Sequence, residues 1–588
     1  MKSLLCYLKD YKKESIFAPL FKMLEALFEL FVPLVMAAII DRGIAHGDYA
    51  EIGRLGAILI ALGIIGLVSS ITAQFFAAKA AVGFATTLRH SLFEHLQNLS
   101  FKEIDSLGTS TMITRMTSDV NQVQNGVNMV LRLFLRSPFI VFGAMIMAFT
   151  INAKAAFVFA VTIPALAVVV IGITAMTIPL YKKVQEKLDG VLSSTRENLT
   201  GARVIRAFAR EKEEKRDFDK KTQELNQLQL HVGGISTLTN PVTFVIVNAA
   251  TMVLLYTGAV QVNQGFITQG EVVALVNYMS QILVELVKLA NLIITITKSL
   301  ACAQRLEAVL NISSSMNIPK ITENRELTRN ITEDMTHVSE NIISFQNVTL
   351  SYNLTGDAAL DECGFTIKRG STVGIIGGTG SGKSSIVNLI PRFYDVTKGA
   401  VLVSDCNVKE YDMNELRSKI GIVMQKAVLF HGTIEENLRW GNENATKEDL
   451  ITALKTAQAW EFVQQKEDGI KFMIAQGGRN LSGGQRQRLT IARALVRKPE
   501  ILILDDSASA LDFATDAALR HAIASLQGGQ TVIIVSQRAS SIMQADQILV
   551  LDDGRLVGNG THEELLDSCA VYQEIYESQF PREREAVR

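Results

Sequence analysis

The segment 372–385, TVGIIGGTGSGKSS, decides the fold of the second half of this chain. Residues 377–384 match the pattern G-x-x-x-x-G-K-[ST], which here follows an apolar run and precedes the helix-like SSIVNLIPRFY. A strand, a glycine-rich loop and a helix in this order are typical of a phosphate-binding loop. Its backbone N–H groups can surround phosphate oxygens at the start of the helix. The context predicts nucleotide binding and leaves a chance glycine-rich loop as a weak alternative.

Two further groups complete the predicted phosphate and Mg²⁺ site. Lys383 would place its ammonium on the β and γ phosphates, and the Ser384 hydroxyl would bind Mg²⁺. The run 501–506, ILILDD, is expected to be a buried parallel strand that ends in carboxylates. Asp505 would then hold Mg²⁺ through water. The predicted nucleotide-binding residues of these two motifs are Gly377, Gly378, Thr379, Gly380, Ser381, Gly382, Lys383, Ser384, Ser385 and Asp505.

Short β-like runs alternate with helical patterns around these motifs. SFQNVTLSY, TVGIIG and ILILDD are examples, and they predict a soluble α/β domain over residues 342–580. The preceding residues 311–341 are polar and rich in Asn, Ser and Thr. They are expected to form a linker.

The first half of the chain has the composition of a membrane protein. Hydrophobic residues make up 48% of the whole chain and charged residues 20%, and the mean hydropathy is +0.22. Residues 1–310 are predicted to form a six-helix transmembrane domain, because a bilayer-spanning helix needs about 20 apolar residues. The expected spans are 16–40, 55–78, 128–151, 155–180, 241–262 and 272–297.

The connections between the spans predict the orientation. The short connections 41–54, 152–154 and 263–271 carry only Arg42, Arg54 and Lys154 as basic residues, whereas 181–240 is rich in Lys and Arg. The positive-inside rule places the long connections in the cytosol, with both termini and the soluble domain. These connections are rich in helix formers. They are interpreted as levers that reach another domain, with a solvated stalk as the alternative.

Charge and cysteine content exclude other classes. The net charge is −1, which gives no overall basic field for nucleic acid binding. The five cysteines are widely spaced and form no CxxC pair, so neither a disulfide framework nor a zinc site is predicted.

A motif between the two nucleotide motifs makes the prediction more specific. Residues 481–485 are LSGGQ, and this motif between a phosphate loop and an apolar-Asp strand resembles the ATP-binding-cassette (ABC) family. The resemblance implies that Tyr352 stacks on adenine and that Gln425 senses Mg²⁺ and the membrane domain. It implies a partner-site signature of Leu481, Ser482, Gly483, Gly484 and Gln485. It also implies a dimer-interface loop of Ser509, Ala510, Leu511 and Asp512.

With six preceding spans, nearly the whole chain resembles an exporter half-transporter of the type IV, or B-family, multidrug kind. The implied cofactors are ATP and Mg²⁺, the latter held by Ser384, Gln425 and Asp505. Two cassettes of such transporters close head to tail, so that each ATP lies between one phosphate loop and the other chain's LSGGQ. By the same resemblance, tips of the long connections near 108–120 and 195–208 dock on the cassettes.

Two catalytic positions depart from the family pattern. Asp506 stands where the family has Glu, and its carboxylate falls about an ångström short of the attacking water, a misplacement that can cost about 100-fold in rate. Gln537 stands where the family has His, and it cannot carry positive charge. Gln476, before the signature, also replaces a common Glu. Because the LSGGQ signature is intact while these catalytic positions are changed, the chain resembles the degenerate-site subunit of a heterodimeric bacterial exporter.

The sequence therefore predicts one half of a heterodimer that exports amphipathic compounds, including drugs, from the cytoplasmic membrane. Its own ATP site would hydrolyse slowly, and its signature would complete a competent site on a partner that supplies Glu and His. The alternatives are a lipid or peptide exporter and an ATP-regulated module that does not pump. Membrane lipid and an amphipathic substrate are expected partners.

Charged residues inside the predicted spans remain to be explained. They occur in pairs three or four residues apart, on one helix face each. A structural ion-pair network is favoured, and a role in substrate binding or coupling is the alternative. The residues are Glu25, Glu29, Arg132, Arg136, Glu285 and Lys288.

Overall fold

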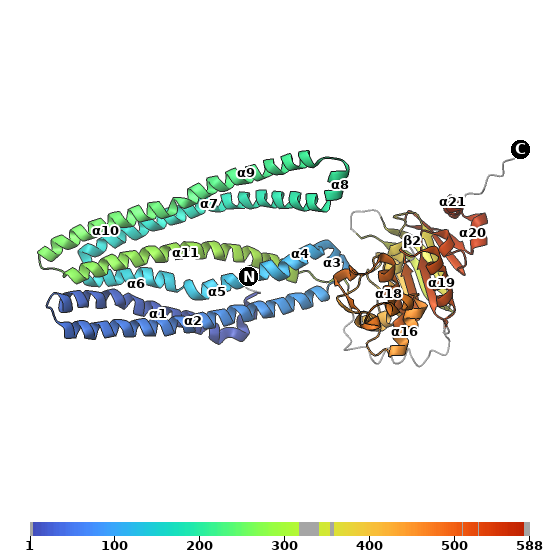
Figure 1. Cartoon of the computed structure of the whole chain (residues 1–588), viewed down its shortest axis with the longest axis horizontal. Coiled ribbons are helices and arrows are strands. Elements are labelled where there is room, and N and C mark those ends of the chain that lie inside the picture. The colour runs from blue at the N-terminus through green and yellow to red at the C-terminus, as the bar shows by residue number, and fades with distance from the viewer. Residues whose placement is uncertain (1–3, 317–339, 353–357, 508–509, 527–528, 581–588) are drawn as a thin grey trace. The chain divides into compact units, whose positions relative to one another are not determined.

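The computed structural model describes residues 4–316, 340–352, 358–507, 510–526 and 529–580. The chain divides into two compact units, which Figure 1 draws as long helices and as a mixed α/β region. The first unit comprises Met1–Asn98 and Leu107–Ser313, and the second comprises Leu99–Ser106 and Ser314–Arg588. Most of the predicted linker 311–341 lies outside the described residues.

The first unit is built from long helices. Within the described residues, six helices are long and apolar enough to cross a membrane, which confirms the predicted six spans. They extend over Leu4–Ile44, Tyr49–Gln97, Thr109–Ile151, Ala153–Thr200, Glu211–Asn263 and Gln269–Leu310. Their main segments are α1 (Lys12–Ala38), α2 (Tyr49–Gln97), α5 (Val120–Leu133), α6 (Arg136–Ile151), α7 (Ala153–Thr200), α9 (Glu211–Thr237), α10 (Thr239–Asn263) and α11 (Gln269–Leu310).

The third predicted span, 128–151, is not one unbroken helix. Helix α5 ends at Leu133, and α6 begins at Arg136. Pro138 lies in the first turn of α6, where its missing N–H needs no partner, whereas inside a continuous helix it would remove a hydrogen bond. The break places the buried Arg136 and Ser137 at the start of α6.

The membrane core packs α1, α6, α7, α10 and α11 around small and aliphatic residues. Ala26, Ala144 and Ala274 are fully buried. Small side chains allow membrane helices to approach closely, because lipid provides no hydrophobic drive between them. The buried Tyr278 donates a hydrogen bond of 2.6 Å to the carbonyl oxygen of Leu30 and so ties α11 to α1.

The two long connections are helical, as predicted. The second runs from α7 through the short helix α8 (Ala202–Ala207) into α9 (Figure 1). The first contains α3 (Phe101–Leu107) and α4 (Thr109–Thr114), with Gly108 between them at φ 71°. The prediction placed the cassette-docking tip near 108–120. The segment Leu99–Ser106 just before it belongs to the second unit, where the Phe101 ring lies 4.6 Å from that of Phe393. The docking of the predicted tips stays a prediction.

The second unit contains two larger sheets. The six-stranded sheet has the order β12-β11-β3-β10-β9-β6, in which β12 alone is antiparallel to its neighbour. Its strands are β3 (Thr372–Gly377), β6 (Ile420–Val423), β9 (Ile501–Asp505), β10 (Thr531–Val535), β11 (Gln547–Asp552) and β12 (Arg555–Gly560). The second, antiparallel sheet, β2-β1-β4-β5, comprises β1 (Asn341–Leu350), β2 (Leu360–Lys368), β4 (Lys398–Val403) and β5 (Cys406–Asn407).

Helices and a two-stranded ladder complete this unit. The ladder pairs β7 (Gly432–Thr433) with β8 (Met473–Ile474). Two hydrophobic clusters are separated by the parallel strands: Ile375 and Ile503 belong to one, and Ile376 and Leu502 belong to the other. The helices are α13 (Lys383–Leu389), α14 (Met413–Ser418), α15 (Ile434–Arg439), α16 (Lys447–Thr456), α17 (Trp460–Gln464), α18 (Gly483–Val496), α19 (Phe513–Ala524), α20 (His562–Ser568) and α21 (Ala570–Gln579).

Candidate nucleotide-binding site

Four neighbouring parallel strands bring the predicted site together. The phosphate loop follows β3, Gln537 follows β10, Asp505 and Asp506 end β9, and Gln425 follows β6. Because β3, β10, β9 and β6 are adjacent and parallel, their carboxyl ends meet at one edge. Ligands of open α/β sheets bind at this edge. The topology thus gathers groups that are far apart in the sequence.

The phosphate loop depends on glycine at its end. Gly382 precedes α13 with φ 93°, a left-handed conformation that glycine adopts without strain. A Cβ atom there would lie 2.7 Å from the carbonyl oxygen of Ala359. Glycine therefore allows the loop to approach β2 and to present backbone N–H groups at the start of α13.

Lys383 is held by the loop itself. Its Nζ donates to the carbonyl oxygens of Gly377 at 2.9 Å and Gly378 at 2.5 Å, and to Ser381 Oγ at 3.3 Å. Burial lowers the pKa of this ammonium, because desolvation disfavours the charged form. These contacts hold the Lys383 ammonium within the loop, where the phosphate oxygens of a bound nucleotide would replace the loop oxygens as its hydrogen-bond acceptors.

Ser384 and Asp505 form the group suited to Mg²⁺. Ser384 Oγ donates to Asp505 Oδ1 at 3.3 Å, and the Asp505 carboxylate is buried at the end of β9. Burial raises the pKa of Asp505, and the neighbouring Asp506 charge adds to this effect. A hydroxyl and a carboxylate are hard oxygen ligands of the kind that Mg²⁺ prefers beside phosphates. The donor set therefore fits the ion.

Asp506 lies beside Gln425. Gln425 Nε2 donates to Asp506 Oδ2 at 3.3 Å, and the backbone N–H of Asp506 donates to the Val535 carbonyl oxygen at 3.0 Å. Asp506 has φ 46°, a left-handed conformation in which aspartate is enriched. Its carboxylate is therefore turned toward the phosphate loop and the lid-loop glutamine, at the predicted catalytic position.

The loop carrying Gln537 is fixed by the C-terminal helix α21. Gln579 Nε2 donates to the Gln537 carbonyl oxygen at 2.7 Å, and Gln579 Oε1 accepts from the Ala539 backbone N–H at 2.7 Å. The Ser536 N–H also donates to the Ile375 carbonyl oxygen. No sequence motif pointed to Gln579, because its role depends on where α21 packs.

Tyr352 lies at the same cavity. Its hydroxyl is 3.0 Å from Ser385 Oγ, and its ring contacts the Tyr394 ring edge-on with centroids 5.0 Å apart. About a third of the residue is exposed, which leaves ring surface free for a flat ligand.

The phosphate loop, strand ends and Tyr352 enclose a cavity of about 340 Å³. Twelve predicted nucleotide and catalytic residues line it, together with Ala359, Val535 and Ser536. The twelve are Tyr352, Thr379, Gly380, Ser381, Gly382, Lys383, Ser384, Ser385, Gln425, Asp505, Asp506 and Gln537. Gly377 and Gly378 meet the site through their carbonyl contacts with Lys383.

The signature lies apart from this cavity, at the start of α18. Ser482 caps the helix: its Oγ accepts from the Gln485 N–H at 3.3 Å, and Gln485 Oε1 accepts from the Ser482 N–H at 3.1 Å. Leu481 is buried, whereas Ser482 and Gly483 are exposed. An exposed helix N-terminus presents N–H groups to an anion.

The predicted interface loop lies beside the signature. A Cβ atom on Gly484 would be 3.2 Å from the Ala510 carbonyl oxygen and 3.9 Å from Leu511 Cδ2. Asp512 caps α19 by accepting from the Thr515 N–H at 2.9 Å, a bond that lowers its pKa. Ser509 lies outside the described residues.

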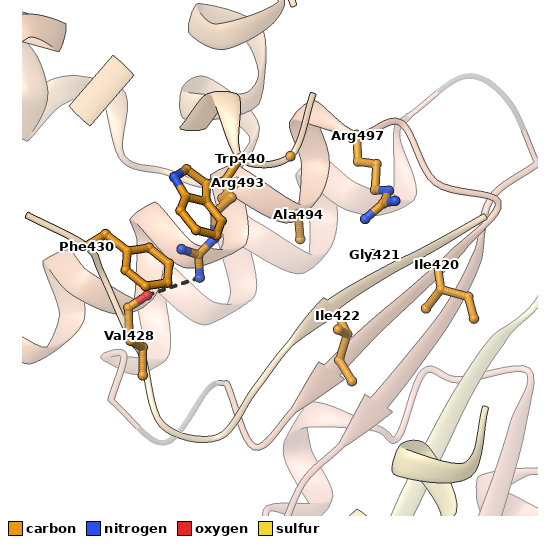
Figure 2. Close-up of a pocket in the computed structure, with 10 residues that line it drawn as sticks. Ile420, Gly421, Ile422, Val428, Phe430, Trp440, Arg493, Ala494 and Arg497 are labelled. Atoms are coloured by element: carbon orange, nitrogen blue, oxygen red, sulfur yellow. Dashed lines mark hydrogen bonds between the residues drawn. The ribbon is translucent and has the colours of Figure 1, made fainter. Parts of the chain in front are cut away.

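The structure also shows a groove on this unit that sequence motifs did not reveal. It is lined by the exposed aromatic residues Phe430 and Trp440 and by the partly buried Arg493 and Arg497 (Figure 2). The Phe430 and Trp440 rings stack with centroids 4.2 Å apart, and Arg493 donates to the Val428 carbonyl oxygen at 3.1 Å. Trp440 is 65% exposed. The aromatic residues of LFHGTIEENLRW were the available signal.

Comparison with known families agrees with both units. Residues 15–286 match the ABC transporter transmembrane region, and residues 360–509 match the ABC transporter ATPase domain. The chain therefore belongs to the ABC transporter family. It has the half-transporter architecture of one membrane domain followed by one ATPase domain, and it is a multi-pass membrane protein whose ATPase domain is cytosolic.

Similar proteins span the whole chain. An uncharacterized ABC transporter ATP-binding protein of Mycobacterium tuberculosis is 36% identical over 97% of each chain, and YfiB of Bacillus subtilis is 36% identical over 99% of each. An ATP-dependent lipid A-core flippase of Haemophilus ducreyi is 28% identical over 98% of each. A bacterial Atm1-family ABC exporter with ATP bound shares the fold, with a TM-score of 0.80, 23% identity and coverage of 97% and 99%.

Proposed function

We propose that this chain is the degenerate-site half of a heterodimeric ABC exporter that moves amphipathic compounds, including drugs, across the cytoplasmic membrane. The observation that carries the proposal is an exposed, capped LSGGQ helix on the same chain as Asp506 and Gln537 at the catalytic strand ends. The signature is complete for a partner's ATP, whereas the chain's own catalytic edge is altered at two positions.

The two alterations act on different parts of hydrolysis. Asp506 would hold the attacking water, but its carboxylate is one methylene shorter than that of glutamate. Gln537 can donate a hydrogen bond to the γ-phosphate, but it provides no positive charge as charge shifts in the transition state. Each defect raises the barrier without removing ATP-binding groups.

Binding of ATP rests on residues that are intact. Lys383 and the loop N–H groups neutralise and orient the phosphates, and Tyr352 covers the adenine. Mg²⁺, held by Ser384, Asp505 and Gln425, supplies charge neutralisation of the β and γ phosphates when bound. The own site is therefore expected to bind ATP tightly and to hydrolyse it slowly.

ATPase measurements on purified protein test the degenerate site. The chain alone should hydrolyse ATP slowly, and the complex with a co-purified second half-transporter should restore turnover. Fast hydrolysis by a homodimer of this chain would reject the proposal. Isolation of the tagged chain from its native membrane identifies the partner directly.

The groove lined by Phe430, Trp440 and Arg493 is proposed to receive α8 of the partner chain. The partner is a half-transporter of the same architecture, and in this chain the α8 region exposes Leu199, Val204 and Phe208, which suit an aromatic groove. Val204→Cys on one chain and Val428→Cys on the other should crosslink between subunits in a background lacking the five native cysteines. Crosslinking only within one chain would contradict the exchange.

A lipid exporter is the second candidate, favoured by the 28% identity to a lipid A-core flippase. A regulatory module that binds ATP without pumping is the third. ATP-dependent dye accumulation in inverted vesicles, inhibited by vanadate, separates a pump from a regulator. Lipid flipping in the same vesicles separates the two kinds of cargo.

A further inference from the structure

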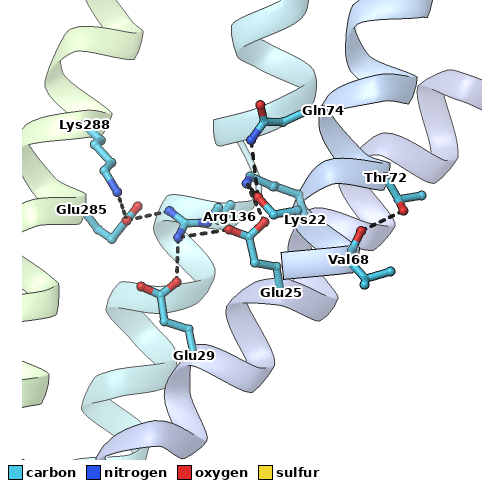
Figure 3. A network of polar contacts seen from close by, with 10 residues as sticks. Lys22, Glu25, Glu29, Val68, Thr72, Gln74, Arg136, Glu285 and Lys288 are labelled. Carbon is cyan, nitrogen blue, oxygen red and sulfur yellow. Dashed lines mark hydrogen bonds and ion pairs between the residues drawn. The ribbon is translucent and has the colours of Figure 1, made fainter. Parts of the chain in front are cut away.

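The charged residues of the membrane unit converge on Glu285 of α11. Glu285 Oε1 accepts from Arg136 Nη1 at 2.6 Å and from Lys288 Nζ at 2.8 Å (Figure 3). Its Oε2 accepts from the Ser137 hydroxyl at 2.8 Å. The Glu285 side chain is only 3% exposed. Its acceptor positions are therefore occupied by partners from α6 and α11.

Arg136 extends the network to α1. Its Nη2 lies 2.6 Å from Glu29 Oε2 and 3.8 Å from Glu25 Oε1, and Lys22 Nζ donates to Glu25 Oε2 and to Ser70. Three cations and three carboxylates balance, as a buried network requires. The favoured structural interpretation therefore holds for this centre, and Lys22 is an addition that the sequence did not single out. Arg132 lies apart, with a buried Nε that lacks a hydrogen-bond partner.

Three members of the network, Glu29, Glu285 and Lys288, line a cavity, and of these Glu29 and Lys288 are partly exposed. This cavity between α1 and α11 measures about 360 Å³, within the range of ligand sites. The Glu29 side chain is 39% exposed and that of Lys288 is 42% exposed. The polar Asn277, Ser280 and Gln281 line the same cavity.

Gln281 gives an independent sign of a missing partner. Its Oε1 is buried, yet it has no hydrogen-bond partner. Buried polar atoms are normally paired, because an unpaired one costs about 1–3 kcal/mol. Structural packing alone leaves this acceptor unexplained, whereas a donor group on a ligand in the cavity would satisfy it.

We propose that this cavity binds a zwitterionic group, with its ammonium at Glu29 and Gln281 and its anionic end at Lys288. The inference rests on the proposed export function, since it names the polar part of the cargo. The ligand class is a compound that carries a cation and an oxyanion a few bonds apart. It is either an amphiphile headgroup or a water-soluble zwitterion.

Charge balance is what selects this class. The network is neutral, so a ligand of one sign would leave a net charge at membrane depth, where uncompensated charge is costly. A zwitterion adds one cation beside Glu29 and one anion beside Lys288, and the sum remains zero. Val32, Pro33 and Val284 line the same cavity and suit the apolar part of the ligand.

Binding of three fluorescent short-chain lipids to the full-length protein, within its complex, tests the site. The probes are a zwitterionic phosphatidylethanolamine, an anionic phosphatidylglycerol and a cationic ammonium lipid. The intact protein should prefer the zwitterion. Glu29→Gln should weaken zwitterion binding about 10-fold and shift preference toward the anion, and Lys288→Gln should shift preference toward the cation.

Matched variants keep the result interpretable. Glu29→Asp and Lys288→Arg should retain zwitterion preference, and neutralising the exposed Lys187–Glu224 pair, 2.6 Å apart, should change nothing. Equal weakening of all three probes by Glu29→Gln and Lys288→Gln, or no weakening, would overturn the proposal. Competition by glycerophosphoethanolamine, which carries one phosphodiester and one ammonium, would identify a water-soluble zwitterion, and lack of competition would identify a headgroup that needs its chains.

The same measurements separate the site from the export function. Probe binding needs no ATP, so charge-dependent binding without ATP-driven translocation would reject the pump and keep the site. Translocation of all three probes with equal efficiency, unaffected by either glutamine variant, would keep the pump and reject the site.

Discussion

The ATPase unit carries two nucleotide-facing regions that differ in completeness. At the start of α18, Ser482 and Gln485 form a reciprocal cap and leave an exposed helix N-terminus. At the strand ends, Lys383 and Asp505 are in place, and Asp506 and Gln537 stand at the positions that are proposed to activate water and stabilise charge.

This difference separates the groups that bind ATP from the groups that act in its hydrolysis. The signature needs only backbone N–H groups and a capped helix start, which are present. In the proposed function, hydrolysis needs one side chain of the right length and one of the right charge, and Asp506 and Gln537 change both. On this proposal a single chain contributes fully to one composite site and weakly to the other.

Ser482→Arg should have the largest effect. In the complex with the partner it should lower ATP turnover by about 100-fold or more, because the arginine blocks the N–H groups offered to the partner's γ-phosphate. Lys383→Ala in the same complex should lower steady-state turnover only a few-fold. Phosphate release measured at saturating ATP compares the two variants directly.

Thr446→Arg is the matched control for Ser482→Arg. Thr446 caps α16 with the same kind of reciprocal bond, which it makes with Asp449. Both substitutions remove a cap worth about 1 kcal/mol, but only Ser482 is proposed to face a nucleotide. Equal losses of ATP turnover from Ser482→Arg and Lys383→Ala would contradict the proposed difference between the two ATP sites of the complex.

Asp506→Glu combined with Gln537→His should raise turnover of the chain alone about 10- to 100-fold. The longer carboxylate regains its reach to water, and the imidazole can carry charge next to the γ-phosphate. Single-turnover hydrolysis measures the chemical step itself. Unchanged hydrolysis in the double variant would locate the defect elsewhere.

The phosphate edge was predictable because its groups lie next to strands with clear patterns. TVGIIG and ILILDD define strand ends, and the carboxyl ends of adjacent parallel strands share an edge, so Lys383 and Asp505 had to meet. Gln579 could not be predicted in this way. Its contact with the Gln537 loop depends on the packing of α21, which no local motif encodes.

The membrane charges show the same limit. Their spacing placed Glu25 with Glu29 and Glu285 with Lys288 on single helix faces, and it favoured an ion-pair network. That Arg136 joins α1 to α11 follows from tertiary packing and from the helix break before α6. The sequence predicted that these charged residues form ion pairs, but it did not predict which residues pair with one another.

Gln579→Ala should have a smaller effect, about two- to five-fold, on hydrolysis by the Asp506→Glu, Gln537→His chain. Loss of its two hydrogen bonds, each worth about 1 kcal/mol, loosens the loop that positions residue 537. The control is Gln573→Ala on the same helix, whose side chain bonds the Leu566 carbonyl oxygen instead. A lower kcat with unchanged apparent affinity for ATP would mark a positioning role, whereas equal effects of the two variants would contradict it.

Asp505→Asn should produce the smallest change, a rise of a few degrees in the melting temperature of nucleotide-free protein. Burial raises the pKa of Asp505, so its contribution to stability is present below the unfolded pKa and is lost as pH rises through the folded pKa. At neutral pH the wild type thus carries an unfavourable buried charge that asparagine lacks, and the gain should shrink as the pH is lowered. Asp552→Asn, at the exposed end of β11, is the control and should show no such trend. A variant that melts below the wild type at neutral pH would show that the Asp505 charge stabilises the nucleotide-free protein. It would then contradict the idea that this carboxylate lowers stability and is present for Mg²⁺ binding.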